Sequence, residues 1–137
     1  MSKRLLGLSI IALSASSSCA AGSSSNKIDM DQAKALVMAS LTPKERRLPS
    51  LGVDPYDDPN SKFLFVTVTW AGTPNGSVIV GNYAVDPYTG DVFSATMACQ
   101  EEKNKSLETL QRKVRATLHL TQAEYQKLKT KGPLCDE

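Results

Sequence analysis

The amino-acid sequence predicts a small α+β domain. Apolar residues recur at helical spacing after residue 28 and again after residue 105, whereas residues 62–98 alternate with a period of two. Short turn clusters divide the alternating region, which predicts an antiparallel meander of three strands, or of four. Such a sheet cannot bury both faces by itself, so we expect an N-terminal helix and C-terminal helices to pack on it.

The first structured segment is predicted to be a helix over residues 30–41. Asp29 supplies a cap and Gln32 stands three residues later, as in a capping box. Thr42, Pro43 and Glu45 have the spacing of a second, short helical start, which we expect to run only to Arg47. The prolines, glycine and acidic residues of Leu48–Ser61 then predict an irregular connection.

Three strands are predicted next, over Lys62–Ala71, Val78–Val85 and Asp91 to about Ala98. The turns between them, residues 72–76 and 86–90, contain the Pro, Asp, Asn and Gly residues that tight turns favour. We interpret both turns, and the acidic residues within them, as ordinary turn chemistry.

Two helices are predicted to close the domain. Leucines and valine fall on one face of residues 106–119, while most basic residues lie off that face. Thr121 and Glu124 form a capping box that opens another helix, with Tyr125 and Leu128 expected to point inward. Gly132 and the proline after it should end that segment.

The chain of 137 residues is long enough for one domain. Its net charge is +2, and without Lys3 and Arg4 the basic and acidic residues balance at 14 each. A neutral domain lacks the surplus of positive charge that nucleic-acid binding requires, so we expect no nucleic-acid partner. No apolar run near 20 residues follows the N-terminus, which excludes a multi-span membrane protein.

The first 20 residues have the three zones of an export signal. Basic Lys3 and Arg4 precede an apolar stretch, Leu5–Leu13, and small residues follow it up to Ala20. We therefore expect a signal peptide over residues 1–20, a tether over 21–27, a single domain over 28–137 and a periplasmic location.

Cleavage before Cys19 is the alternative, as in bacterial lipoproteins, and it would anchor the protein to a membrane through a lipid. Ser16 stands three residues earlier, where lipoprotein signals usually carry Leu. Soluble export is therefore the favoured prediction, and lipidation of Cys19 the alternative.

Cys99 and Cys135 are the cysteines that remain after the processing region. In an oxidising compartment an even pair predicts a disulfide, worth roughly 3–4 kcal/mol for a loop of this length. The alternative is a thiol-dependent enzyme in which Cys99 is the nucleophile and His119, the sole histidine, is the base. We favour the disulfide and expect no catalytic residues.

The acidic cluster Asp54, Asp57, Asp58 and Asn60 has oxygen ligands suited to calcium, but its spacing does not match an EF-hand loop. We interpret these residues as solvated turn residues and expect no metal and no cofactor.

Charge is unevenly distributed along the chain. Residues 28–100 carry five basic and eight acidic side chains, whereas residues 103–131 carry eight basic side chains against Glu108 and Glu124. This two-sided field indicates either a solvated helical face or electrostatic steering of a charged partner.

Two resemblances bear on function. Tyr83-Ala84-Val85-Asp86 followed by Thr89-Gly90-Asp91-Val92 resembles the strand–turn–strand of PepSY-type domains. The whole layout, an export signal, about 110 further residues, two cysteines and no catalytic set, resembles the small exported immunity proteins that protect bacteria from type VI secretion amidase effectors.

The second resemblance implies a periplasmic protein-binding inhibitor that occludes the active site of a peptidoglycan amidase. The first implies the alternative, an envelope lipoprotein with a structural or PepSY-like regulatory role. A homodimer is compatible with either function. Because loops on a rigid scaffold can block a cleft, we expect partner contacts in two loops and at two arginines. The candidates are Arg46, Arg47, Tyr56, Asp57, Asp58, Thr73, Pro74 and Asn75.

Overall fold

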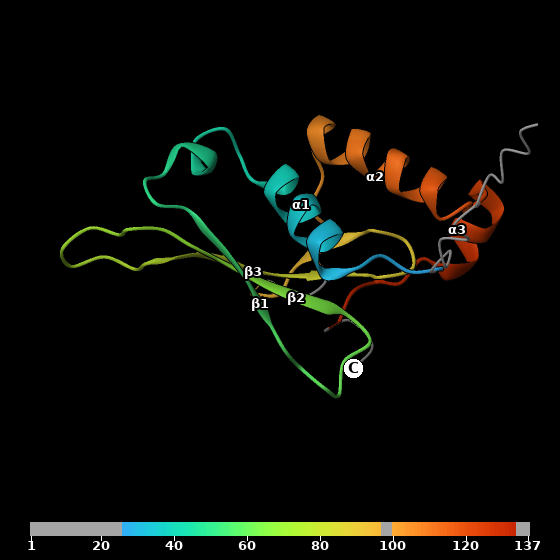
Figure 1. The fold of residues 1–137 in the computed structure, drawn as a ribbon, viewed down its shortest axis with the longest axis horizontal. Coiled ribbons are helices and arrows are strands. Elements are labelled where there is room, and N and C mark those ends of the chain that lie inside the picture. The colour runs from blue at the N-terminus through green and yellow to red at the C-terminus, as the bar shows by residue number, and fades with distance from the viewer. Residues whose placement is uncertain (1–25, 97–99, 134–137) are drawn as a thin grey trace, which may run out of the picture.

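The computed structural model describes residues 26–96 and 100–133. These residues form a four-stranded antiparallel sheet and three α-helices (Figure 1), which confirms the predicted α+β meander. In chain order the elements are α1 (Met30–Ser40), the 3-10 turn η1 (Glu45–Arg47), β1 (Gly52–Tyr56), β2 (Leu64–Thr69), β3 (Ile79–Val85), β4 (Val92–Ser94), α2 (Lys105–Thr117) and α3 (Gln122–Leu128). The predicted signal peptide and most of the tether lie outside the described residues.

The strands lie in sequence order, β1-β2-β3-β4, and every neighbouring pair is antiparallel. Both α1 and α2 lie on one side of the sheet, above it in Figure 1, with α1 next to the strands and α2 packed on α1. The fold is therefore layered, with α1 and α2 on the same side of the sheet.

Strand β1 corrects the prediction that Leu48–Ser61 is wholly irregular. Gly52 pairs with Thr69 and Tyr56 pairs with Phe65, so this proline-containing segment is the fourth strand. Proline lacks an N–H group, but at a sheet edge only one side of the strand needs hydrogen bonds. Pro55 is therefore compatible with the edge position, which sequence composition alone concealed.

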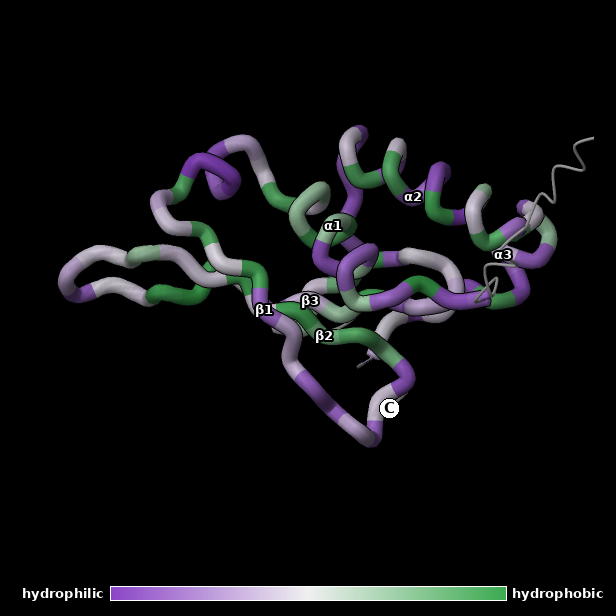
Figure 2. Tube along the Cα trace, in the orientation of Figure 1, coloured by the Kyte–Doolittle hydropathy of each residue, from purple (hydrophilic) through white to green (hydrophobic). Residues whose placement is uncertain are grey.

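The main core lies between the sheet and α1. It contains Leu36 and Val37 of α1, Val66 and Val68 of β2, and Leu107 of α2, all fully or almost fully buried. Figure 2 shows the same division, with hydrophobic residues along β2 and hydrophilic ones over the loop that joins β1 to β2. At about 25 cal/mol per Å² of buried apolar area, this core supplies most of the favourable free energy of folding.

A smaller cluster closes part of the opposite face. Phe63 and Phe93 meet edge to face with their ring centroids 6.0 Å apart, and Ala84, the register partner of Phe93, packs with them. The chain beyond α3 returns to this cluster, because a Cβ added at Gly132 would lie 2.9 Å from Phe93 Cδ1. The C-terminal segment thus covers the β4 side of this face.

Helix ends follow the predicted local signals. Asp29 accepts a hydrogen bond from the Gln32 amide, and Thr121 accepts one from the Glu124 amide, so both predicted capping boxes form. Asn104 caps α2 and also donates from its Nδ2 to the carbonyls of Ala39 and Ser40 at the end of α1. That single side chain joins the two helices.

Two details differ from the predictions. The three predicted strands are shorter at their ends than expected, since β2 stops at Thr69 and β4 at Ser94. Leu128 was expected to point inward but is 44% exposed. Helix α3 ends at Leu128, so it anchors to the domain mainly through Tyr125.

Candidate functional site

A hairpin arm, residues 70–78 between β2 and β3, projects beyond the sheet and the helices (Figure 1, left). Its predicted contact residues Thr73, Pro74 and Asn75 are all exposed at the tip. The Gly76 amide donates to the Thr73 carbonyl at 3.0 Å, so these residues form a tight turn with Pro in the position that favours it. The arm contains no charged side chain.

The arm is braced along its length. The Trp70 amide donates to the Val78 carbonyl at 2.8 Å, and the Trp70 indole Nε1 donates to the Ser77 carbonyl at 3.0 Å. Gly72 has φ of +74°, a conformation that side chains disfavour, and a Cβ there would lie 2.9 Å from Val78 Cγ1. These contacts hold the arm as one defined shape at the end of the sheet.

The segment after α1 supports the base of the arm, because the Ala71 amide donates to the Pro49 carbonyl at 3.0 Å. Arg46 in this segment is engaged within the chain: its Nε and Nη2 donate to the carbonyls of Leu41 and Ala39. Arg47 donates to the Pro43 carbonyl and is exposed. Partner contacts by these two arginines stay a prediction, and Arg46 also caps α1.

The other predicted contact residues lie at the opposite end of β1. Tyr56 is 61% exposed, and its ring meets Phe65 edge to face at 6.1 Å. Asp57 is exposed, and Asp58 accepts a hydrogen bond from the Asn60 amide, as a turn residue does. Four residues of strand, about 13 Å, separate this group from the base of the arm, so the predicted contacts form two groups.

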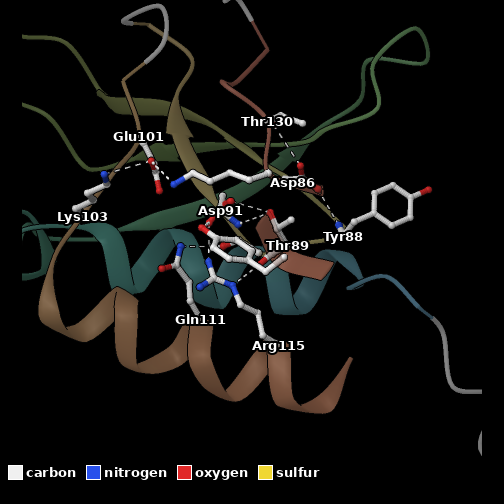
Figure 3. A network of polar contacts seen from close by, with 12 residues as sticks. Asp86, Tyr88, Thr89, Asp91, Glu101, Lys103, Gln111, Arg115 and Thr130 are labelled. Carbon is white, nitrogen blue, oxygen red and sulfur yellow. Dashed lines mark hydrogen bonds and ion pairs between the residues drawn. The ribbon is translucent and has the colours of Figure 1, made fainter. Parts of the chain in front are cut away.

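A buried polar network is the feature that sequence reasoning missed (Figure 3). Asp91 is 1% exposed and accepts hydrogen bonds from Arg115 Nη2 at 2.6 Å and from the Tyr125 hydroxyl at 3.1 Å. Arg115 also donates to the Thr89 carbonyl, and its guanidinium lies 3.9 Å from the centre of the Tyr125 ring. The network fastens the β3–β4 turn to both α2 and α3.

Burial raises the pKa of Asp91 above its ordinary value of 3.8, and the adjacent Arg115 and the Thr89 hydroxyl oppose that rise. Burial likewise raises the pKa of Tyr125, which the neighbouring Asp91 charge reinforces. The sequence contains one signal of this network, because Asp86 and Asp91 flank a turn that includes Thr89 and Gly90. The partner in α2 could not be identified without the fold.

The predicted disulfide partners, Cys99 and Cys135, lie outside the described residues. The disulfide stays a prediction. His119 is exposed at the junction of α2 and α3 with φ of +55° and lines a hollow of about 570 Å³ with Tyr88 and Leu128.

Within the ranges 26–96 and 100–133, no group of three or more His, Cys, Asp and Glu side chains is arranged to hold a metal ion. None of the helices in those ranges combines the length and apolar character that crossing a bilayer requires.

No family model matches this chain, and no curated protein matches it in sequence. Its fold is similar to a chain of a solved type VI secretion system effector-immunity complex from Pseudomonas protegens. The TM-score is 0.58, the identity is 20%, and the match covers 74% of this chain and 86% of that one. At this identity the likeness establishes a shared fold.

Proposed function

We propose that this protein is a non-enzymatic periplasmic inhibitor that blocks the active site of a peptidoglycan-cleaving effector, with an amidase as the target. The projecting, braced arm of residues 70–78 is the observation that carries this proposal. The similarity of fold to a chain of an effector-immunity complex supports it independently.

The chemistry of the arm suits insertion into a cleft. Moving a charge out of water costs several kcal/mol unless a partner charge compensates it, and residues 70–78 carry none. Thr73 and Asn75 offer hydroxyl and amide groups that can hydrogen-bond where a peptide or glycan substrate would. Because the arm is already ordered by its own hydrogen bonds, little conformational entropy is lost on binding.

The test is inhibition of sacculus digestion by a candidate amidase effector, chosen from the genes that neighbour the one encoding this protein. The protein is produced with its own N-terminal segment and purified from the periplasm, and release of soluble peptidoglycan fragments is measured. We expect stoichiometric inhibition by the unaltered protein. Replacing residues 71–77 with Asn-Gly closes the hairpin between Trp70 and Val78 and should weaken inhibition by about 100-fold or more, as loss of a central contact does.

The matched control is Tyr88→Ala, at the α3 end of the domain, which should inhibit normally. Circular dichroism and thermal unfolding establish that the shortened variant is folded. Full inhibition by the shortened variant would rule out insertion of the arm. If the protein forms a complex with neither the amidase nor a glycan-cleaving effector, the proposed function is wrong. Mass spectrometry of the purified protein distinguishes cleavage after Ala20 from lipidation of Cys19.

A further inference from the structure

Two rows of side chains cross the sheet on the face opposite the helices. The register places Asp54, Thr67 and Asn82 side by side on β1, β2 and β3. Two residues further along the strands, Tyr56 and Phe65 form the second row. The rows are about 7 Å apart, since each strand residue adds about 3.3 Å and alternate residues share a face.

The first row is rich in hydrogen-bond acceptors. The Thr67 hydroxyl donates to Asn82 Oδ1 at 2.8 Å, which leaves the Thr67 oxygen with lone pairs facing solvent. Asp54 is exposed on the same face, next to Thr67, and its carboxylate lies on the Gly52 side of the row, with Oδ2 3.3 Å from a Cβ placed at Gly52.

The second row is aromatic and open. Tyr56 is 61% exposed and Phe65 is half-buried, with their rings edge to face. The rows border a hollow of about 300 Å³ lined by Tyr56, Phe65, Thr67 and Asn82. That volume is at the lower limit of small-molecule sites and suits one inserted side chain.

An arginine side chain matches this pair of rows. Its guanidinium stacks on aromatic rings, and its N–H groups fit a carboxylate and adjacent oxygens in a fixed fork. A lysine ammonium offers neither planarity nor a fork. The nearest basic side chain in sequence, Lys62, lies over Phe63 instead, at 5.4 Å from its centroid.

We infer that the hollow lined by Tyr56, Phe65, Thr67 and Asn82, with the exposed Asp54 beside Thr67, binds an arginine on the surface of the protein partner. The hollow shares its face of β2 with the base of the arm, because Phe65, Thr67 and Thr69 follow one another on that face over about 13 Å of strand. A partner that receives the arm and extends about 13 Å along this face reaches the hollow. The identity of that partner rests on the proposed function, but the arginine chemistry does not.

The first experiment measures affinity for the effector by titration calorimetry. Asp54→Lys should weaken binding by about 10- to 100-fold, the usual range for losing a charge-assisted hydrogen bond. Glu108→Lys makes the same charge change on α2 and should stay within about twofold. Tyr56→Ala should weaken binding by about tenfold, whereas Tyr88→Ala, at a similarly exposed tyrosine, should not.

The second experiment needs no effector. Isotope-labelled protein is titrated with N-acetyl-arginine amide and, separately, with N-acetyl-citrulline amide, which has the same shape without the charge. We expect saturable NMR shifts with arginine alone, confined to residues that line the hollow and abolished by Asp54→Asn. A dissociation constant on the order of 1–10 mM is expected for so small a ligand.

The outcomes separate the two proposals. If shortening the arm abolishes inhibition while Asp54→Lys and Tyr56→Ala leave affinity unchanged, the hollow is not a contact and the inference is wrong. If no effector binds, the proposed function fails, and the arginine titration still decides the inference. Equal shifts with arginine and citrulline, or no saturable shift, would overturn it.

Discussion

Replacing Arg115 by Met should destabilise the protein far more than replacing Arg112 by Met. Arg115→Met removes the 2.6 Å contact to Asp91, the hydrogen bond to the Thr89 carbonyl and the stacking on Tyr125. Removing one partner of a buried ion pair costs about 3–5 kcal/mol, because the remaining charge is buried without compensation. The Arg115 side chain is 20% exposed, so water recovers part of that cost and we expect about 2–4 kcal/mol.

Arg112 is the matched control because it stands one helical turn earlier on α2, is exposed, and makes only a 3.4 Å hydrogen bond to Thr109. Its replacement should change the free energy of unfolding by no more than about 0.5 kcal/mol. Both variants are compared with the unaltered protein by urea denaturation followed by circular dichroism.

The deficit of Arg115→Met should also depend on pH. Arg115 opposes the rise in the pKa of Asp91, so its removal raises that folded-state pKa further above the ordinary value of 3.8. A carboxyl group whose pKa is raised on folding destabilises the protein above that pKa and ceases to do so once it is protonated. The deficit should therefore shrink as the pH falls from neutral toward 3.8. An equal loss in Arg112→Met, or a deficit independent of pH, would refute this account of the network.

Three further predictions follow from packing and covalent structure. Asn104→Ala should lower the free energy of unfolding by about 1–2 kcal/mol, because it removes the cap of α2 and two hydrogen bonds to the end of α1. Thermal or urea unfolding measures this loss, and a value below about 0.5 kcal/mol would contradict the prediction. Gly132→Ala should cost more than Gly90→Ala in the same assay, because both have positive φ but the new Cβ would lie 2.9 Å from Phe93 Cδ1 at Gly132 and 3.4 Å from Val114 Cγ1 at Gly90. Thiol titration of the exported, natively folded protein should find neither Cys99 nor Cys135 free, whereas two free thiols would remove the disulfide and reopen the thiol-enzyme alternative.

Local patterns predicted the elements whose causes are local. The capping boxes at Asp29 and Thr121 require residues three positions apart, so their spacing in the sequence is enough to predict them. The β2–β3 hairpin is likewise predicted by apolar and polar residues that alternate on either side of a turn rich in Pro, Asn and Gly. The exposed tip of the arm was placed correctly for the same reason.

Features that depend on the fold were not predictable in this way. Strand β1 forms because β2 offers a free edge to Gly52–Tyr56, against the local preference of Pro55 and its acidic neighbours. The pairing of Asp91 with Arg115 joins residues 24 positions apart, on a turn and a helix. From sequence, Arg115 is one basic residue among several on α2. Only the packing of α2 beside the β3–β4 turn distinguishes it from Arg112.

The distribution of these features separates stability from recognition. The buried network and the contacts around Asn104 join α1, α2, α3 and the β3–β4 turn on the helical side of the sheet. The arm and the hollow lined by Tyr56 and Phe65 make few contacts with those helices. Their sequences can therefore change with the partner at little cost to folding. Exposed Lys105, Arg112 and Lys113 on α2 repel a cationic surface, while Asp54 and Asp57 attract it. We therefore expect an arginine-bearing partner to be steered toward the open sheet face, and its association rate to fall as salt screens both effects.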